Sequence, residues 1–168
     1  MRIEARAVRI PGDDIDTDVL YPGQFLSITR VEKMAVHLFE GLDPALRGRL
    51  GGGTALVVGS NFGSGSSREH VPQAMRASGI RFLVGHGFAR IFSRNCVNLG
   101  VPPIVCPEAV EAAVDDGPIV LDLDACTVLV GGVAYPFPAP PPFMRQIHAA
   151  GGLVPWVQAR VSATTRVV

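Results

Sequence analysis

The pattern of hydrophobic and polar residues predicts strands alternating with helices. Short apolar runs bounded by glycine or proline are typical of buried strands, whereas apolar residues repeating every three or four positions predict helices. The predicted strands are 3–10, 54–58, 80–84, 103–106, 119–123 and 127–130, and the predicted helices are about 29–41, 67–78, 88–99, 107–115 and 143–150. Because the order over 54–106 is strand–helix–strand–helix–strand, we expect an α/β fold with a mostly parallel central sheet and flanking helices.

Capping patterns support two of these helices. Thr29 with Glu32 and Ser66 with Glu69 both match Ser/Thr-x-x-Glu, in which the first side chain caps a helix start. The segment 11–23 is instead dense in Asp, Pro and Gly and predicts a long loop. We expect residues 11–30 to be mobile when no partner is bound, and the whole chain, 1–168, to form one domain.

Composition and charge exclude several classes of function. The chain has 15 basic and 15 acidic residues, so its formal net charge is zero and no field would attract nucleic acid or an anionic membrane. Its first residues lack the apolar run of a secretion signal, and no stretch approaches the roughly 20 apolar residues of a membrane span. We therefore expect a soluble, cytoplasmic protein with no nucleic-acid or membrane partner.

The cysteines argue against a metal or cofactor held by this chain. Cys96, Cys106 and Cys126 are odd in number, widely spaced and without a Cys-x-x-Cys pair. Nor do the four aspartates of 13–18 match a calcium loop, because Val19 and Phe25 occupy the positions of its glycine and its bidentate glutamate. We expect the cysteines to be small buried apolar residues.

The strongest chemical signal is Gly-Ser-Asn-Phe-Gly-Ser-Gly-Ser-Ser-Arg-Glu-His at 59–70, between a predicted strand and a predicted helix. Its glycines allow close approach of a ligand to the backbone, and Arg68 can hold a carboxylate through two parallel hydrogen bonds. No lysine completes a phosphate-binding loop, no third glycine completes a dinucleotide fingerprint, and Ser64 is wrongly spaced for a nucleophile elbow. An ordinary capping turn remains the alternative to an anion site.

Three separated segments resemble the small subunits of 3-isopropylmalate dehydratases, which correspond to the swivelling β/β/α domain of the aconitase superfamily. The resemblance covers residues 1–160 and rests on 59–70, on Asp16-Thr17-Asp18 followed by Pro22-Gly23-Gln24-Phe25-Leu26, and on Gly87-Phe88-Ala89-Arg90-Ile91-Phe92-Ser93-Arg94-Asn95-Cys96-Val97-Asn98-Leu99-Gly100. His86-Gly87 departs from the Lys-Ser pair found before Phe-Ala-Arg in many relatives.

The resemblance implies a hydro-lyase of two chains, forming a heterodimer or heterotetramer. The large subunit would carry a [4Fe–4S] cluster as Lewis acid, and this chain would bind none. Ser66 would be the general base, Ser67 and Arg68 would bind a dicarboxylate-type substrate beside Gly65, and Asp18 would orient a histidine of the partner. On the residues alone, an Asx turn is an equal alternative for Asp18. Arg30 is a further candidate for substrate contact, with a solvated side chain in the first helical turn as its equal alternative.

The same resemblance assigns substrate choice to the segment Phe25-Leu26-Ser27. Its apolar surface suits an alkyl substituent and therefore favours the conversion of 2-isopropylmalate to 3-isopropylmalate in leucine biosynthesis. Methylmalate, dimethylmalate and homoaconitate are the alternative substrates. A function of a different class, a regulatory or non-catalytic subunit that binds carboxylates, also fits the residues.

Overall fold

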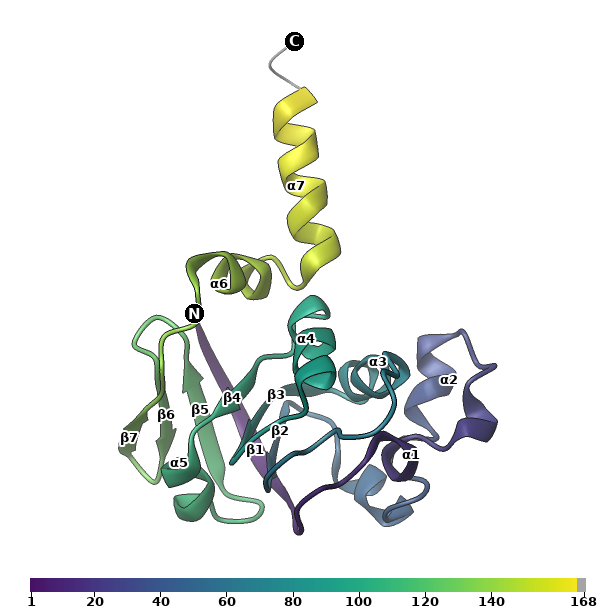
Figure 1. Cartoon of the computed structure of the whole chain (residues 1–168). Coiled ribbons are helices and arrows are strands. Elements are labelled where there is room, and N and C mark those ends of the chain that lie inside the picture. Colours follow the sequence, from purple (N-terminus) through teal and green to yellow (C-terminus); the bar gives the residue numbers. More distant parts are fainter. Residues whose placement is uncertain (166–168) are drawn as a thin grey trace.

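A seven-stranded sheet forms the centre of the computed structural model, which describes residues 1–165, with side chains through residue 162 (Figure 1). The strand order is β4-β3-β2-β1-β5-β6-β7. Strands β1 to β4 are parallel to one another, whereas β5 pairs antiparallel with β1 and continues into the antiparallel strands β6 and β7. The expected α/β class, with a parallel part of the sheet and flanking helices, is confirmed.

The strands and helices follow one another along the chain with short connections. The strands are β1 (Arg2–Ile10), β2 (Thr54–Val58), β3 (Ile80–Gly85), β4 (Pro103–Val105), β5 (Pro118–Asp122), β6 (Thr127–Val130) and β7 (Val133–Pro136). The helices are α1 (Thr17–Leu20), η1 (Gly23–Phe25), α2 (Val31–Ala35), η2 (Pro44–Arg49), α3 (His70–Ala77), α4 (Arg90–Asn98), α5 (Pro107–Ala112), α6 (Pro142–Ala149) and α7 (Leu153–Thr165), where η marks 3-10 helices.

Each face of the sheet packs against its own hydrophobic core, because side chains of a strand alternate between the two faces. Leu56 and Val58 of β2 join the core under helices α1 to α4. Ala55 and Val57 join the second core, which α5 and strands β5 and β6 complete. All five residues of β2 are buried, as the continuous apolar run predicts.

Several boundaries differ from the prediction. The segment 11–23 contains helix α1, whose N-cap Asp16 accepts hydrogen bonds from the backbone N–H groups of Asp18 and Val19. Helix α2 begins at Val31 with no side-chain cap, so the predicted Thr29 capping box is wrong. Strand β7 and helix α7 were not expected from the pattern; β7 is an exposed edge strand.

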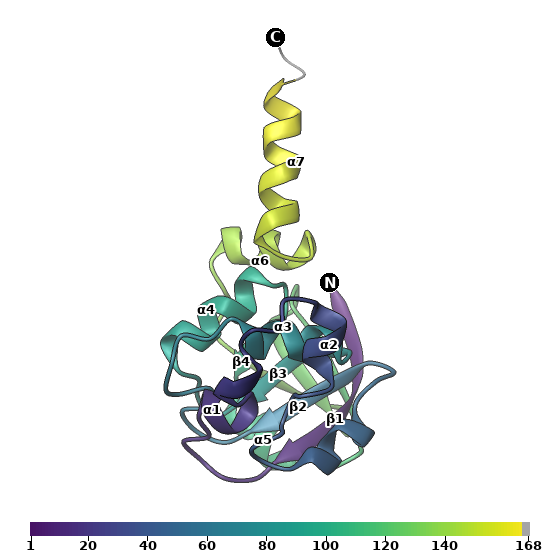
Figure 2. The ribbon, with the colours of Figure 1, turned by 90° about the vertical axis from the view of Figure 1, so that its right-hand side faces the viewer.

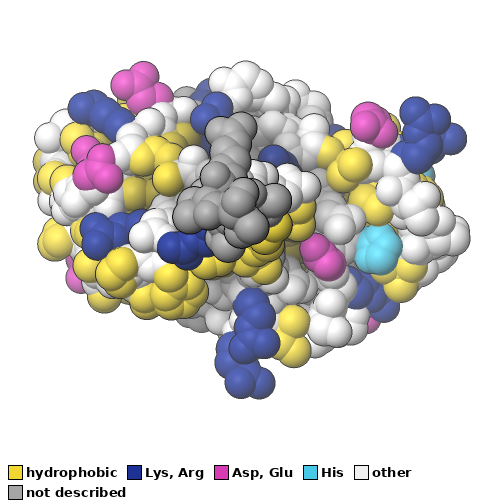
Figure 3. Space-filling model, turned by 90° about the horizontal axis from the view of Figure 1, so that it is seen from above, with side chains coloured by type: hydrophobic (Ala, Val, Ile, Leu, Met, Phe, Trp, Pro, Cys, Tyr) yellow, Lys and Arg dark blue, Asp and Glu magenta, His cyan; other side chains and the backbone are white. Residues whose placement is uncertain are grey.

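Helix α7 rises away from the body of the molecule, beyond α6 and α4 (Figures 1 and 2). Seen from above, this side of the molecule carries scattered basic and acidic side chains among hydrophobic ones (Figure 3). Within residues 1–165, no helix combines the length and the hydrophobicity that crossing a bilayer requires.

Candidate active site

Two loops that are distant in sequence meet at the carboxyl edge of the parallel sheet. One follows β1 and the other follows β2, and because these strands are parallel neighbours, both loops leave from the same edge. A parallel bridge joins Asp16 to Ser64. The backbone N–H of Gly63 donates to Ile15 O at 2.8 Å, and that of Thr17 donates to Ser64 O at 2.9 Å.

The aspartates of the first loop hold the second loop in place. Asp13 accepts the backbone N–H of Ser60 at 2.6 Å, and Asp14 accepts the side-chain amide of Asn61 at 2.8 Å. Both carboxylates therefore hold the two loops together. No group of three or more His, Cys, Asp or Glu suited to a metal ion occurs among the residues that the structure describes.

The cysteines are equally unsuited to hold a cluster. Cys96 and Cys106 are buried and Cys126 is half-buried, and all three have free thiols. Burial raises the pKa of the Cys96 and Cys106 thiols above the ordinary value, which opposes formation of the thiolates that bind iron. The donor set of the described residues does not fit an iron–sulfur cluster.

Arg68 is fixed at the centre of the junction. Its guanidinium forms an ion pair with Asp18, and Nη1 also donates to the backbone oxygen of Tyr21 at 3.3 Å. The Arg68 side chain is only 20% exposed, whereas that of Asp18 is 60% exposed. Gly23 lies beside the guanidinium, because a Cβ built there would be in ordinary van der Waals contact with Nη2, at 3.6 Å. The structure thus brings two predicted site residues, Asp18 and Arg68, into direct contact.

Ser66 and Ser67 lie on the exposed part of the same loop. The backbone oxygen of Ser66 accepts the Thr17 hydroxyl at 3.1 Å and the Arg68 N–H at 2.8 Å. These bonds fix the main chain and leave the serine side chains on the surface. Helix α3 begins only at His70, with Glu69 as an N-cap that makes no side-chain cap bond. The prediction that Ser66 caps this helix is therefore wrong, because the helix begins beyond the serines.

Two glycines shape the loop between the bridge and Arg68. Gly63 has φ +78°, and a Cβ there would lie 2.2 Å from Cγ of the buried Phe92. Gly65 has φ +86°, a region that side chains rarely adopt. Both positions require glycine for this path of the backbone, and Gly63 also for the close approach to α4.

The predicted specificity segment packs beside Arg68 through Tyr21. The buried Tyr21 donates its hydroxyl to Phe25 O at 3.3 Å, and its ring stacks on His70 with centroids 5.9 Å apart. The Phe25 ring stacks on His37, with centroids 3.9 Å apart and planes at 13°. Leu26 is half-buried against the core, whereas Ser27 is exposed.

Arg30 does not join this group in the structure. Its side chain is 73% exposed and lies 3.9 Å from the carboxylate of Glu32. The solvated alternative therefore describes this conformation of Arg30. Thr17 and Tyr21, by contrast, belong to the junction but were missed. A buried threonine between two aspartates gives no signal of its own in a single sequence, because only the neighbouring loop shows what it binds.

Comparison with known proteins gives consistent results. The model of the family described as Aconitase C-terminal domain matches residues 42–109. The 3-isopropylmalate dehydratase small subunit of Moorella thermoacetica is 41% identical over 155 residues, covering 91% of this chain and 93% of the relative. The 2,3-dimethylmalate dehydratase small subunit of Eubacterium barkeri is 39% identical, with coverages of 88% and 92%. A crystal structure of 3-isopropylmalate dehydratase from Methanocaldococcus jannaschii is 34% identical, with a TM-score of 0.91 and full coverage of both chains.

Proposed function

Because the chain belongs to the family of 3-isopropylmalate dehydratase small subunits, we propose that it is one half of a hydro-lyase that interconverts 2-isopropylmalate and 3-isopropylmalate. The observation that carries this proposal is the loop in which Arg68 is held rigidly while Ser66 and Ser67 stay exposed beside it. A half-site of this kind needs a second surface to enclose a substrate.

In the proposed reaction, Arg68 binds a substrate carboxylate. Nη1 of Arg68 already contacts the Asp18 carboxylate and the backbone oxygen of Tyr21. The substrate carboxylate would therefore either bind through Nη2 and Nε or take the place of Asp18. Asp18 is 60% exposed, so its carboxylate can turn into solvent when a substrate carboxylate takes its place on Arg68. Arg68 would then hold the carbon next to the carboxylate above Ser66.

Ser66 would accept the proton from that carbon at Oγ. The C–H electron pair forms the C=C bond while hydroxide leaves the neighbouring carbon, and addition of water at the other carbon gives the isomer. An alkoxide at Ser66 needs nearby positive charge, which Arg68 supplies, and exclusion of water by a partner would strengthen this interaction. Ser67 lies next in the loop and would donate to the same carboxylate.

We propose that the partner is a large subunit carrying a [4Fe–4S] cluster. Bound there, the cluster would supply Lewis-acid chemistry at the leaving hydroxyl. The poor fit of this chain's own cysteines to a cluster, and the names of the relatives as small subunits, support this division between two chains.

A second substrate deserves a direct comparison, namely 2,3-dimethylmalate. The relative from Eubacterium barkeri is named for it, and the apolar side chains of Phe25 and Leu26 suit small alkyl groups as well as an isopropyl group. Isopropylmalate carries its three alkyl carbons as one group on a single carbon, whereas 2,3-dimethylmalate carries one methyl group on each of two carbons. Burial of each methylene-sized unit is worth about 0.8 kcal/mol.

Reconstitution tests the proposal. The purified chain is mixed anaerobically with the cluster-loaded large subunit of the same organism, and both malates are assayed by formation of the alkene intermediate. We expect no activity from this chain alone, activity in the mixture, and a higher kcat/KM with 2-isopropylmalate. A stable complex without activity on either malate would contradict the catalytic role and favour a regulatory one.

A further inference from the structure

A cavity lies at the opposite edge of the sheet from the candidate active site. It has a volume of about 340 Å³ and is bounded by the starts of β1 and β3, the ends of α3 and α4, and the end of α6. Three arginines line it, one each from β1, α3 and β3, namely Arg2, Arg76 and Arg81. None of its described lining residues is Asp or Glu.

The three guanidinium groups differ in how their charges are balanced. Arg2 lies 3.9 Å from Glu4 and opposite Asp122 in the β1–β5 register, so acidic groups are near it. Arg76 donates from Nη1 to the backbone oxygen of Leu99 at 3.0 Å, which satisfies one of its five N–H groups. Among the described residues, no ion pair joins Arg76 or Arg81 to a carboxylate. Two positive charges therefore share the cavity without an acidic partner.

His148 is a buried polar residue at the wall of the cavity, beside the arginines. This α6 residue lines the same cavity, is only 6% exposed, and its Nδ1 is buried without a hydrogen-bond partner. Buried polar groups in proteins are nearly always satisfied, by water if not by protein or ligand. Burial lowers the pKa of His148 to about 4, so its ring is neutral at pH 7 and can carry a proton on Nδ1.

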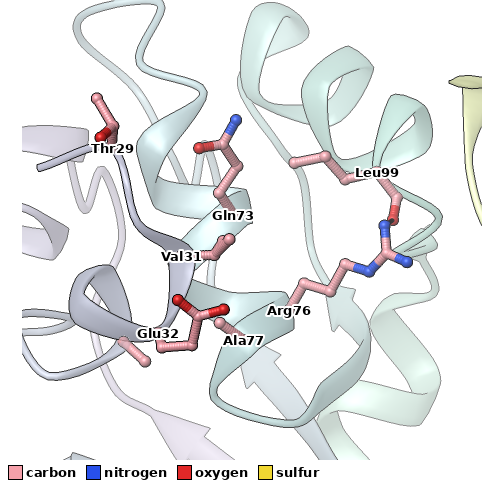
Figure 4. A pocket seen from close by; sticks show the side chains of 8 residues that line it. Thr29, Val31, Glu32, Gln73, Arg76, Ala77 and Leu99 are labelled. Carbon is pink, nitrogen blue, oxygen red and sulfur yellow. Dashed lines mark hydrogen bonds between the residues drawn. The ribbon is translucent and has the colours of Figure 1, made fainter.

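A larger groove nearby is also lined by Arg76 but includes an acidic residue. That groove, of about 710 Å³, lies between α2 and α3 and contains Glu32 and Gln73. Figure 4 shows that the Arg76 side chain extends away from Glu32 and toward Leu99. Leu99 lines both cavities, so the guanidinium lies at the boundary of the arginine-lined one.

We propose that the cavity lined by Arg76, Arg81 and His148 binds a small oxyanion of charge two or more. The volume suits a molecule of the size of pyrophosphate or citrate, and the arginines can donate several hydrogen bonds to phosphate or carboxylate oxygens. The bound ion would bridge α6 to the sheet at the point where Gly151, which also lines the cavity, leads into α7.

Calorimetric titration of the full chain with pyrophosphate, at constant ionic strength, tests this site, and citrate in a parallel titration separates phosphate from carboxylate recognition. We expect saturable binding of one ion per chain. The double substitution Arg76→Gln and Arg81→Gln removes exposed charges without disturbing the core and should weaken binding at least tenfold, since hydrogen bonds to charged groups contribute about 1.5–3 kcal/mol. The control Arg94→Gln, on exposed α4 surface, should change the affinity less than about twofold.

A second measurement locates the ion. Nitrogen-15 spectra of the His148 ring should change during the titration, and α6 should exchange its amide hydrogens more slowly with the ion bound. Absence of saturable binding up to about 10 mM would overturn the proposal. So would equal weakening by Arg94→Gln, which indicates nonspecific attraction, or binding that leaves the His148 ring unchanged, which places the ion elsewhere.

Discussion

Asp18 and Arg68 form an ion pair between helix α1 and the loop after β2, so the guanidinium proposed for substrate binding already holds a carboxylate. Asp18 therefore stands where one oxygen of a substrate carboxylate would be expected. The pair keeps Arg68 ordered before substrate arrives, and the exposure of Asp18 lets its carboxylate turn into solvent when a substrate carboxylate takes its place. Preorganisation of this kind reduces the conformational cost of binding.

Arg68→Lys should preserve the fold and impair catalysis. Lysine keeps the positive charge but cannot form two parallel hydrogen bonds with a carboxylate. We expect kcat/KM of the reconstituted enzyme to fall roughly 30-fold or more, which corresponds to a loss of about 2 kcal/mol in transition-state stabilisation. Arg145→Lys, on the exposed surface of α6, is the matched control and should leave kcat/KM unchanged. An equal loss in both variants would contradict the carboxylate role of Arg68.

Ser66→Ala should abolish turnover while the complex with the large subunit still forms. Removal of Oγ removes the proposed base, and the backbone oxygen that holds the loop to Thr17 is retained. Gel filtration measures the complex and the alkene assay measures turnover. Ser78→Ala provides the control, because Ser78 only donates to Ala74 O at the end of α3. Wild-type activity in Ser66→Ala would eliminate this serine as the base.

Gly63→Ala should destabilise the chain much more than Gly131→Ala. Both glycines have positive φ, so both substitutions carry backbone strain of about 1 kcal/mol. At Gly63 the new Cβ also collides with Phe92, whereas nothing lies within 4 Å at Gly131. We expect an additional loss of about 1–3 kcal/mol for Gly63→Ala in urea unfolding. Similar losses at the two sites would show that the loop adapts by moving away from α4.

His148 should make the stability depend on pH. Its folded pKa of about 4 lies below the unfolded value of 6.5, so the unfolded chain binds the proton more strongly. The contribution of neutral His148 to the free energy of unfolding is fully present above pH 6.5. It decreases by about 3 kcal/mol as the pH falls toward 4. Urea midpoints measured between pH 4.5 and 7.5 should show a smaller decrease at low pH for His148→Asn than for wild type. Parallel curves would indicate that His148 titrates normally.

Thiol labelling should distinguish the three cysteines. Cys96 and Cys106 are buried and have raised pKa values, whereas Cys126 is half-buried. In the folded chain an Ellman titration should therefore detect Cys126 first, and all three should react rapidly in denaturant. Fast reaction of Cys96 in the folded chain would contradict its position in the core.

Most strands could be predicted because a short apolar run and the glycine or proline that bounds it are visible in the local sequence. The run Thr54–Val58 is apolar on both faces and ends at glycine, and this is sufficient to predict a buried parallel strand. The position of the glycine-serine loop then follows from the rule that carboxyl ends of parallel strands share an edge. Strand β7 lacked such a signal because three of its four residues are exposed. Helix α7 lacked the amphipathic pattern that predicts a helix, because its apolar residues do not gather on one face.

The predicted capping box at Ser66 failed in part for a tertiary reason. Ser66 and Glu69 have the right spacing, but Thr17 and the Arg68 N–H bind the backbone oxygen of Ser66 and hold the chain in a non-helical turn. Arg68 belongs to the same loop as Ser66, but Thr17 comes from the loop after β1. Tyr21 was missed for the same reason, because its link between Phe25 and Arg68 exists only after the two loops meet. One sequence shows which residues are available and not which distant ones they will contact.

The parallel bridge between Asp16 and Ser64 also has a consequence for protein synthesis. Strands β6 and β7 pair with the strand that precedes each of them along the chain, but β1 must wait for β2 while the intervening 43 residues between Ile10 and Thr54 are made. The other partner of β1, strand β5, is made later still. Closing such a long loop costs entropy before any contact compensates for it. On a ribosome, the pocket-forming loops therefore remain apart until residues beyond Arg68 have left the exit tunnel, and a truncated nascent chain would carry β1 as an unpaired edge.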